Sequence, residues 1–549
     1  MKKLVLLSVL IITNTITTQW QTNGVAVCDT NSNSGFYMLP QIASDGEGGA
    51  FVCWKDARSG LDYDIYMQHI LSDGSMQFPH NGIPICDATN TQQFPRMISD
   101  GKGGAFAAWE DGRDGTNLYV YAQRISATGE KLWGVQGIKV AEKGGLMISM
   151  ATNVKGNLLV GWIYGGTDDV VIQQLDSLGN KIWSDSGIQV ANRSGDVYSN
   201  DIAITEDDCG GAYIVWSEGD FPIYQVFVQR IDSSGKILFQ QNGIPLTDST
   251  LKHIDVSCSR DLEGGIIVSW SSLPISATSQ DTAYKYVQRI SPDGDLMWGL
   301  KGVRVGGVLG GGAQRHTGDG QGGAYIGHGR WIQHVSKEGN PLWSGEGVPF
   351  TLVPSYFINS SQTLNSLSGG IWNFWAQQLE QQTTHIYGQY IDCNGNRLWE
   401  TNGRSICTAA NFQDWPKSIT SDNGSAILVW DDFRNGHSNI FAAKVDTVGV
   451  ITHVADKEEV IPTVPYLEQN YPNPFNPETT INYSIPNTTK VKLTVFDLLG
   501  REIVKLVDKL QLKGNYSEKF SSKNLASGIY LYQLTADKLT TTKKLVILH

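Results

Sequence analysis

The chain has 549 residues, which is more than one ordinary domain requires and enough to bury large cores. Its formal net charge is −12 at pH 7 and it has no basic stripe, which excludes nucleic acid as an expected partner. Only 17% of the residues are charged and 60 are glycine, a composition typical of many short strands joined by tight turns. We therefore expect an all-β protein.

Residues 1–18 have the pattern of a secretory signal peptide. Lys2 and Lys3 form a basic start, residues 4–12 are a largely apolar run, and a polar stretch follows. The apolar run is too short to span a bilayer. We expect the signal peptide to be removed near Thr18, which leaves no transmembrane segment in the mature chain.

Residues 19–450 form a tandem repeat with a period of about 54 residues. Each unit has an apolar run that ends in tryptophan, except one degenerate unit in which His328 takes that position; the tryptophans are Trp54, Trp109, Trp162, Trp216, Trp270, Trp375 and Trp430. Turn motifs such as Asp-Gly-x-Gly-Gly separate the apolar runs, so each unit has room for roughly four short strands. In the first unit we expect strands near 40–44, 49–55, 64–70 and 75–86.

A second marker occurs eight times: an aromatic residue followed four positions later by glycine. The pairs are Trp20/Gly24, Phe78/Gly82, Trp133/Gly137, Trp183/Gly187, Phe239/Gly243, Trp298/Gly302, Trp343/Gly347 and Trp399/Gly403. The first pair precedes the first tryptophan unit, and none follows Trp430. The segment near Trp20–Cys28 would then supply the missing end of the last unit, as a circular array requires if it is to leave no open sheet edge. We expect an eight-bladed β-propeller, and an open β-solenoid is the rival.

The seven cysteines are expected to be free thiols, although disulfides are common in exported chains. Cys28, Cys86 and Cys407 occupy one position of the repeat, where other units have alanine or a larger apolar residue. Small buried apolar side chains explain this pattern. The odd number also leaves at least one cysteine unpaired.

Three units share the motif Trp-x-Asp-x-Arg-x-Gly, with an aromatic residue beside proline in the preceding connection. The candidate ligand-binding residues are Asp56, Arg58, Asp111, Arg113, Asp432, Arg434, Phe94 and Trp415. These units are neighbours in a closed ring, so the charged side chains and aromatic rings would share one sector of one rim. Sugars bind such surfaces through ring stacking and paired polar contacts. The alternative is that each aspartate caps a tight turn and that each arginine pairs with it or with a neighbouring blade.

The sequence contains no evident catalytic, metal or cofactor motif. The ten histidines are scattered, without H-E-x-x-H or zinc-ligand spacing, and nucleophile-elbow and calcium-loop motifs are absent. Gly318–Gly323 matches G-x-G-x-x-G, but it aligns with the turns of the other units and lacks a βαβ context. We therefore expect no cofactor, no metal and no catalytic residue.

The C-terminal region has a pattern of its own. Residues 451–466 contain Pro462 and Pro465 without an apolar period and are expected to be a linker. The marker residues that follow are Pro472, Asn473, Pro474, Phe475, Asn476, Pro477, Gly500, Gly528, Lys543 and Lys544. In order and spacing, residues 467–549 resemble the type-A C-terminal sorting domain of the type IX secretion system. The resemblance implies a small immunoglobulin-like β-sandwich, recognition by the type IX secretion machinery, passage through the periplasm to the outer-membrane surface or the medium, and removal of the domain near the linker.

Three functions fit this organisation. The first is a secreted or surface-attached, non-enzymatic propeller that binds an extracellular glycan or protein, which we favour because the repeats are nearly uniform. The second is a propeller-type glycoside hydrolase or lyase, which needs paired carboxylates near the central channel. The third is a purely structural envelope protein.

Overall fold

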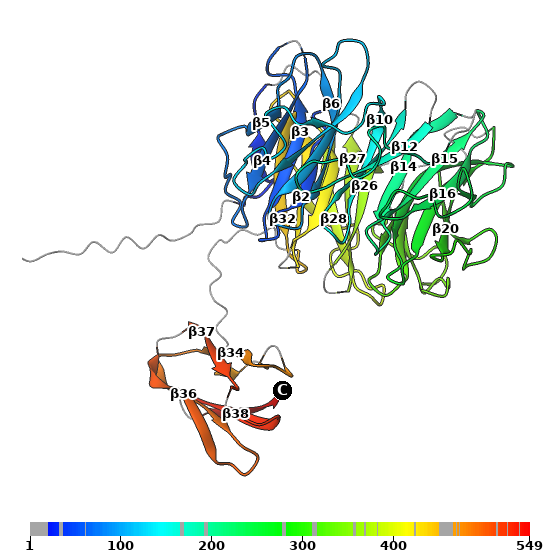
Figure 1. The fold of residues 1–549 in the computed structure, drawn as a ribbon. Helices are drawn as coiled ribbons and strands as arrows, with labels where there is room; N and C mark the ends of the chain where they lie inside the picture. Colours follow the sequence, from blue (N-terminus) through cyan, green and yellow to red (C-terminus); the bar gives the residue numbers. More distant parts are fainter. Residues whose placement is uncertain are drawn as a thin grey trace, which may run out of the picture. The chain divides into compact units, whose positions relative to one another are not determined.

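The structure is a computed structural model, and it describes residues 20–31, 37–60, 62–164, 169–191, 196–276, 282–309, 316–354, 358–366, 369–380, 383–421, 424–449, 465–467, 469–470, 473–511, 514–523, 525–536 and 539–548. The chain divides into two compact units, Met1–His453 and Val454–His549 (Figure 1). The expected signal peptide and most of the expected linker lie outside the described residues. Every helix or strand element in the described part of the chain is a β-strand, so the all-β class is confirmed.

Among the described residues, the first unit contains eight four-stranded antiparallel sheets, which we number in chain order. Sheets 1 to 4 consist of β2 (Gln41–Ser44), β3 (Ala50–Asp56), β4 (Asp64–Ile70) and β5 (Ile83–Cys86); β6 (Gln92–Ser99), β7 (Ala105–Asp111), β8 (Tyr119–Ile125) and β9 (Ile138–Lys139); β10 (Leu146–Thr152), β11 (Leu158–Tyr164), β12 (Asp169–Leu175) and β13 (Ile188–Gln189); and β14 (Asp196–Glu206), β15 (Ala212–Gly219), β16 (Gln225–Ile231) and β17 (Ile244–Pro245). The strand expected near 75–86 is shorter in the structure, because the turn from Pro79 to Gly82, where Gly82 has a φ of 77°, lies within its first part.

Sheets 5 to 8 complete the first unit. They consist of β18 (Lys252–Arg260), β19 (Ile266–Leu273), β20 (Thr282–Ile290) and β21 (Val303–Leu309); β22 (His316–Gly318), β23 (Ala324–His328), β24 (Trp331–Val335) and β25 (Val348–Pro349); β26 (Ile358–Asn365), β27 (Ile371–Glu380), β28 (Thr383–Ile391) and β29 (Arg404–Cys407); and β30 (Gln413–Thr420), β31 (Ala426–Asp432) and β32 (Asn439–Val445) together with β1 (Val25–Cys28).

The Asp-Gly-x-Gly-Gly motif forms the turn between the first and second strands. In sheet 1, Asp45 Oδ1 accepts the backbone N–H of Glu47 at 2.8 Å and that of Gly49 at 2.9 Å. Gly46 has a φ of 77°, which glycine adopts without steric cost. The same acceptor geometry recurs at Asp100, Asp207 and Asp261. One tight turn therefore accounts for the repetition of this motif along the chain.

The second strand of each sheet is apolar on both sides because the sheets pack face to face. One hydrophobic cluster joins Phe51 and Cys53 of sheet 1 to Ala107 and Trp109 of sheet 2. Similar clusters lie between each later pair of successive sheets. A further cluster joins sheet 8 to sheet 1, where Val429 packs with the residues around Trp54. Burial on both faces of the strand is what the uninterrupted apolar runs of the sequence require.

The N-terminal strand belongs to sheet 8. β1 pairs antiparallel with β32, with Val25 opposite Ala442. Trp20, which precedes β1, is only 1% exposed and donates from Nε1 to the Ser72 carbonyl oxygen of sheet 1 at 3.1 Å. Gly24 lies against Trp430, and a Cβ atom at that glycine would be 2.6 Å from the indole ring. The first described residues of the unit thus pack within the sheet that contains its last repeat tryptophan, Trp430.

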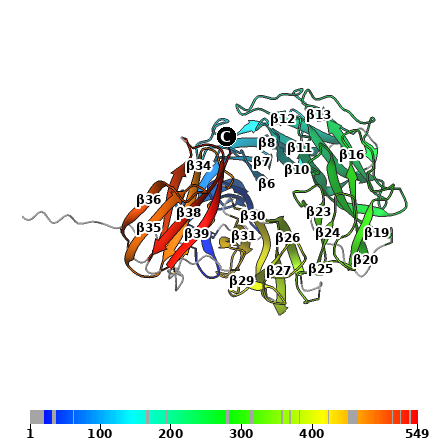
Figure 2. The same cartoon turned by 90° about the horizontal axis from the view of Figure 1, so that it is seen from below.

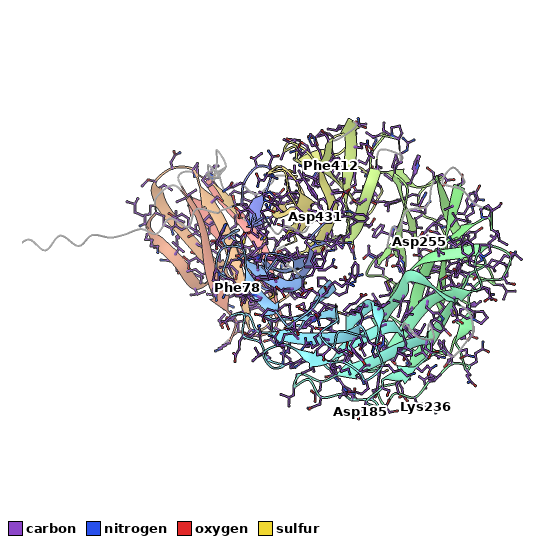
Figure 3. All side chains as sticks on the ribbon, turned by 90° about the horizontal axis from the view of Figure 1, so that it is seen from above. Phe78, Asp185, Lys236, Asp255, Phe412 and Asp431 are labelled. Carbon is purple, nitrogen blue, oxygen red and sulfur yellow. The ribbon has the colours of Figure 1, made fainter. Side chains whose placement is uncertain are left out.

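The first strands of the sheets lie innermost. β2, β6, β10, β14, β18, β22, β26 and β30 each lie beside the next one, and β30 lies beside β2. Figures 2 and 3 show the sheets following one another around a common centre. In Figure 3, Asp255 and Asp431 lie toward this centre, whereas Asp185 and Lys236 lie at the periphery.

The second unit is a sandwich of two antiparallel sheets. One sheet consists of β33 (Tyr466–Leu467), β34 (Glu478–Ile485) and β37 (Gly514–Ser521), and the other of β36 (Glu502–Gln511), β35 (Thr489–Phe496), β38 (Gly528–Ala536) and β39 (Leu539–Ile547). Both sheets contribute to one core that includes Ile481, Tyr483, Leu493 and Tyr532. In the described residues of both units, no helix is long and apolar enough to cross a membrane.

Candidate functional site

The Trp-x-Asp-x-Arg motif builds the same set of contacts in sheets 1, 2 and 8, which we call the arginine clamp. In sheet 2, Trp109 Nε1 donates to Asp111 Oδ2 at 2.7 Å, and Arg113 Nη2 donates to the same oxygen at 2.6 Å. Asp111 is buried, and its Oδ1 accepts the backbone N–H of Arg113 at 3.0 Å. One carboxylate therefore caps the turn, accepts a hydrogen bond from the buried indole and pairs with the guanidinium group.

Each guanidinium group is enclosed on its other sides as well. The Arg113 guanidinium carbon lies 3.8 Å from the centre of the Tyr121 ring, and Nη2 lies 3.0 Å from the Gln136 carbonyl oxygen and 3.3 Å from Cys86 Sγ. The equivalent partners are Tyr66, Asn81 and Cys28 for Arg58, and Phe441, Asn23 and Cys407 for Arg434.

The clamp also accounts for the recurring cysteine. Burial raises the pKa of Cys28 and of Cys407 to about 12 and that of Cys86 to about 11, so these thiols stay protonated at neutral pH. All seven cysteines of the chain lie in the described residues and are free. The expectation of free thiols is confirmed.

These contacts give the six charged residues of the predicted ligand face a structural role; they are Asp56, Arg58, Asp111, Arg113, Asp432 and Arg434. The three arginine side chains are 22%, 22% and 18% exposed, and the three aspartate side chains are 0% exposed. A docking surface needs guanidinium groups that are free to bind a ligand, and these are already paired with a carboxylate, a carbonyl oxygen and an aromatic ring. The contacts match the alternative in which aspartate caps the turn and pairs with its own arginine.

Phe94 and Trp415, the two aromatic candidates, lie on β-bulges in the first strands of sheets 2 and 8. The pairing register of β6 shifts after Gln93, and that of β30 shifts after Asp414. Phe94 and Trp415 have φ values of 49° and 53°, a backbone region that large side chains rarely adopt. Their side chains are 41% and 43% exposed. Backbone strain of this kind persists where the surrounding structure enforces it, and it concentrates at functional sites.

Other sheets share one or both of these features: Leu39 has the positive φ just before β2, and register shifts occur in other first strands. Leu39, Met147 and Asp255 also have positive φ, with values of 53°, 60° and 59°, and register shifts interrupt β10, β14, β18 and β26 as well. These first strands are innermost, so the bulges surround the centre of the unit. We call Leu39, Phe94, Met147, Asp255 and Trp415 the bulge ring. Leu39, Met147 and Asp255 were not expected from the sequence, because they share no residue type.

An acidic residue directly after the repeat tryptophan fixes the bulge of the next sheet. Asp431 of sheet 8 accepts the backbone N–H groups of Met38 and Leu39 at 2.8 and 3.2 Å. Glu110 of sheet 2 accepts the backbone N–H of Met147 at 2.9 Å. Each carboxyl group thereby satisfies amide groups that have left the strand pairing, and it joins two neighbouring sheets.

Burial shifts the pKa values of three charged groups near the bulge ring. Burial raises the pKa of Asp431 to about 7, and the neighbouring Asp414 adds to the rise. Burial also raises the pKa of Glu110 and lowers that of Lys55. The Lys55 ammonium group lies 5.6 Å from the centre of the Phe94 ring. Carboxyl and ammonium groups thus lie close to the exposed aromatic residues.

Other aromatic and polar side chains hold Trp415 in place. Tyr37 lies edge-on to Trp415 and to Phe433, with ring centroids 6.2 and 5.4 Å apart. Asp414 Oδ1 accepts the backbone N–H of Trp415 and the Ser360 hydroxyl at 2.8 and 2.7 Å. The exposed indole is therefore positioned by contacts from sheets 1, 7 and 8.

In the second unit, the Asn-Pro-Phe motif is tied to the last strand. The backbone N–H of Phe475 donates to the Val546 carbonyl oxygen at 3.1 Å, and its carbonyl oxygen accepts the N–H of Leu548 at 3.1 Å. Asn473 Oδ1 accepts the N–H of Val546 at 2.8 Å, and Asn473 Nδ2 donates to the Lys544 carbonyl oxygen at 3.3 Å. The motif and the C-terminal strand are thus one structural element.

The remaining marker residues lie on turns and strands of the same sandwich. Gly500, with a φ of 78°, lies in the turn between β35 and β36, where Asp497 Oδ1 accepts the N–H groups of Leu499 and Arg501. Gly528 begins β38, and Lys543 lies on β39 beside Lys544. Pro472 lies outside the described residues.

The two units define a β-rich protein whose C-terminal sandwich carries a motif bound to its own last strand. Residues 469–548 match the family model of the secretion system C-terminal sorting domain. The second unit is therefore a sorting domain of the type IX secretion system, and the chain is exported to the cell surface or secreted.

Comparison of the whole chain adds likeness of fold only. No match was found among curated protein sequences. Similar solved structures include puromycin hydrolase (TM-score 0.37, 11% identity, 70% of this chain and 57% of that one), polysaccharide lyase Uly1 (0.40, 10%, 79% and 95%) and α-L-arabinanase of Penicillium chrysogenum (0.33, 11%, 65% and 93%). The chain thus spans little more than half the length of puromycin hydrolase.

Proposed function

We propose that the first unit is an eight-bladed β-propeller that binds an extracellular saccharide at the bulge ring without transforming it. The observation that carries the proposal is the pair Phe94 and Trp415, two large aromatic residues held at positive φ and more than 40% exposed on innermost strands. Exposed aromatic faces beside charged groups suit the apolar faces and hydroxyl groups of a sugar ring.

Several features support the propeller. Each four-stranded sheet would be one blade, and the hydrophobic clusters join every blade to the next, including sheet 8 to sheet 1. β1 completes the last sheet, and β30 lies beside β2. In an open solenoid, the first and last sheets would not pack against each other.

A hydrolase would require two carboxylates near the ligand. Two lie close to the bulge ring, but both are buried and hold the backbone in place. Asp414 and Asp431 are opposite each other in the pairing of β30 with β31, and both are buried. The Asp431 oxygens accept hydrogen bonds from two backbone amides and from the Ser438 hydroxyl. A general acid must reach the bond it protonates, so this pair favours binding of an intact ligand.

Removal of either exposed ring is expected to weaken saccharide binding at least tenfold. Trp415→Ala and Phe94→Ala each delete a stacking surface, and a loss of about 1.4 kcal/mol of binding free energy corresponds to one factor of ten. The ligand would be found with a glycan array on the mature chain, residues 20–549, and its affinity measured by titration calorimetry.

Phe412→Ala is a matched control, because Phe412 is an exposed aromatic residue of sheet 8 that lies outside the bulge ring. The melting temperatures of all three variants are expected to stay close to that of the parent. Unchanged affinity of Trp415→Ala and Phe94→Ala would refute a site at the bulge ring. Release of reducing sugar from the bound glycan would show an enzyme, and an array without any bound glycan would favour a protein ligand.

Removal of Lys543–His549 is expected to stop delivery through the outer membrane. The truncation deletes the strand segment that pairs with Phe475, so the sorting motif loses its backbone partners. Fractionation should find the truncated chain in the periplasm, while Lys490→Ala, an exposed change on β35, should leave export normal. Surface delivery of the truncated chain at the parental level would contradict the assigned role of this element.

A further inference from the structure

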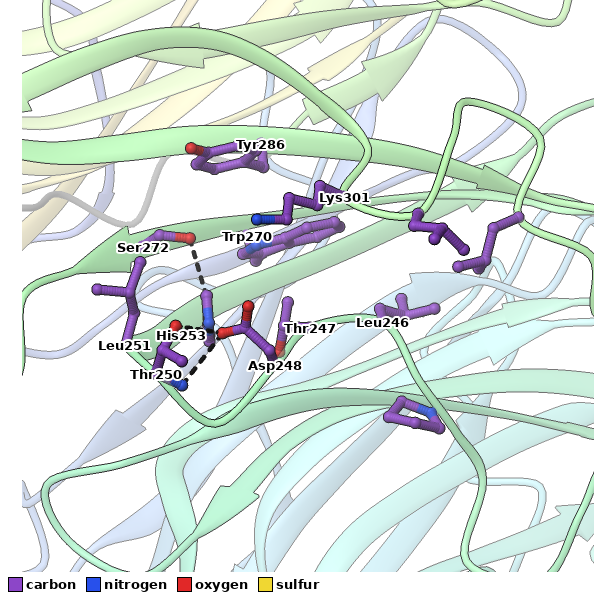
Figure 4. A pocket seen from close by; sticks show the side chains of 13 residues that line it. Leu246, Thr247, Asp248, Thr250, Leu251, His253, Trp270, Ser272, Tyr286 and Lys301 are labelled. Carbon is purple, nitrogen blue, oxygen red and sulfur yellow. Dashed lines mark hydrogen bonds between the residues drawn. The ribbon is translucent and has the colours of Figure 1, made fainter.

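Sheet 5 has lost the arginine clamp and has a cavity in its place. After the repeat tryptophan, Trp270, the positions of the clamp aspartate and arginine are taken by Ser272 and Pro274. A cavity of about 430 Å³ opens there, between sheets 4 and 5 (Figure 4). Its volume is in the range of small-molecule sites.

The walls of this cavity are the positions that enclose the guanidinium group in the clamps. Tyr286 pairs with Trp270 in the strand register, as Tyr121 pairs with Trp109 in sheet 2. Lys301 directly precedes Gly302 of the aromatic-glycine marker, as Gln136 precedes Gly137. Both Tyr286 and Lys301 line the cavity. The space that holds an arginine side chain in sheets 1, 2 and 8 is therefore open in sheet 5.

The cavity contains polar groups that have no hydrogen-bond partner in the part of the chain that the structure describes. Trp54, Trp109 and Trp430 donate from Nε1 to a clamp aspartate at 2.7 to 2.8 Å, and Trp216 donates to Glu218 at 2.8 Å. Trp270 Nε1 has no hydrogen bond to any of the described residues. His253, which is 5% exposed, has its Nδ1 2.8 Å from Ser272 Oγ, and the backbone of Asp248 lies close to its ring. Its buried Nε2 has no hydrogen-bond partner among the described residues. An unpaired buried polar group destabilises the protein, and a ligand that pairs with it removes that cost.

The charged groups of the site are arranged differently from those of the clamps. The buried carboxylate that accepts from the indole in sheets 1, 2 and 8 is absent, and the Lys301 ammonium group is added at the cavity wall. Asp248 also lines the cavity beside His253 (Figure 4), and its Oδ1 accepts the backbone N–H of Thr250 at 3.1 Å. Burial lowers the pKa of His253 to about 4, so its ring is neutral at physiological pH. The inner part of the cavity thus offers hydrogen-bond donors and a positive charge.

We propose that this cavity binds a hexuronate residue, a sugar ring that carries a carboxylate. The ligand carboxylate takes the place of the missing clamp aspartate and accepts from Trp270 Nε1 and Lys301 Nζ. The sugar ring takes the place of the guanidinium group on the face of Tyr286, and Asp248 accepts from its hydroxyl groups. A guanidinium ligand fits less well, because the carboxylate that binds it in the clamps is missing and Lys301 repels it.

Calorimetric titration of the mature chain with glucuronate tests this site. We expect saturable binding, with glucose, acetate and arginine each at least tenfold weaker, because each lacks either the ring or the carboxylate or carries the wrong charge. Lys301→Ala and Trp270→Phe should each weaken glucuronate binding at least tenfold. Lys236→Ala, an exposed lysine change at the periphery, should have no effect. Absence of saturable glucuronate binding, or equal affinity for glucose or for arginine, would overturn the proposal.

The double variant Ser272→Asp/Pro274→Arg rebuilds the clamp and should abolish glucuronate binding by filling the cavity. Its melting temperature reports whether the fold is kept. If the double variant does not fold, the exposed Lys301→Ala variant still tests whether glucuronate binds in this cavity. The site is independent of the bulge ring, so Phe94→Ala/Trp415→Ala should bind glucuronate like the parent. Loss of glucuronate binding in that variant would move the site to the bulge ring and refute the assignment to sheet 5.

Discussion

Replacing Asp111 with alanine is expected to lower the free energy of unfolding of the first unit by about 3–5 kcal/mol, the usual cost of leaving a buried charge without its partner. The substitution removes the acceptor of the Trp109 indole, the ion-pair partner of Arg113 and the cap of the turn at once. Arg113 keeps its Tyr121, Gln136 and Cys86 contacts but loses its counter-charge. Chemical denaturation followed by tryptophan fluorescence would measure the loss.

Asp114→Ala is the matched control for this variant. Asp114 is an exposed aspartate three residues further along the same turn, and it accepts the backbone N–H groups of Thr116 and Asn117. Its removal should cost about 1 kcal/mol or less. Asp111→Asn should fall between the two, because an amide oxygen still accepts from the indole but does not neutralise Arg113. Equal stability of Asp111→Ala and Asp114→Ala would contradict the structural role of the clamp.

Deletion of residues 20–28 is expected to lower the stability of the first unit more than any other change, because it removes a whole strand and a buried tryptophan. β32 loses its partner β1 and becomes an open edge, and Trp20 no longer bridges to the Ser72 carbonyl oxygen. Open edges pair with other chains, so we expect aggregation as well as a lower melting temperature. Size-exclusion chromatography and thermal unfolding would show both effects.

A synthetic peptide of residues 20–31 provides the control for the deletion. If the truncated chain fails only because β32 is unpaired, the peptide added in excess should restore part of the melting temperature. A peptide with Trp20→Ala and Val25→Asp should restore less, since both side chains are buried in the cluster between sheets 8 and 1. A truncated chain that is monomeric and as stable as the parent would contradict the role of β1.

Much of the architecture follows from local patterns in the sequence. The apolar run that ends at Trp54 needs cover on both faces, and stacked sheets supply it. The eightfold aromatic-glycine marker begins before the first tryptophan unit, and β1 is found in the sheet of Trp430. These features could be predicted from a single sequence, because they depend on residues that are close together in the chain or on regular spacing along it.

The chemistry of the rim was harder to infer. The sequence allows Asp111 and Arg113 to be an exposed ligand-binding pair or, as turn residues of repeats usually are, a structural pair. Contacts with Tyr121 of the adjacent strand and Cys86 of the neighbouring sheet distinguish the two. The bulge at Met147 was missed because a contact from the preceding sheet holds its backbone, where Glu110 accepts the backbone N–H of Met147. The proline after Phe94 indicates an irregular strand, but it does not indicate exposure.

The cavity in sheet 5 could not be predicted from the sequence either. Loss of the clamp at Ser272 and Pro274 is visible in the sequence as degeneration of a repeat. Only the packing of Tyr286 and Lys301 around the vacated space distinguishes a site from a repacked core. Where a repeat unit lacks the side chains of the other units, a cavity at the equivalent position is therefore a candidate binding site.

The most direct test of saccharide binding at the bulge ring is fluorine NMR of the mature chain labelled with 5-fluorotryptophan, during titration with a glycan selected on the array. The resonance of Trp415 is identified by its absence in Trp415→Phe. We predict that this resonance shifts with saturation, while those of the buried Trp54, Trp109 and Trp430 stay in place. A saturating glycan that leaves the Trp415 resonance unmoved would contradict the account.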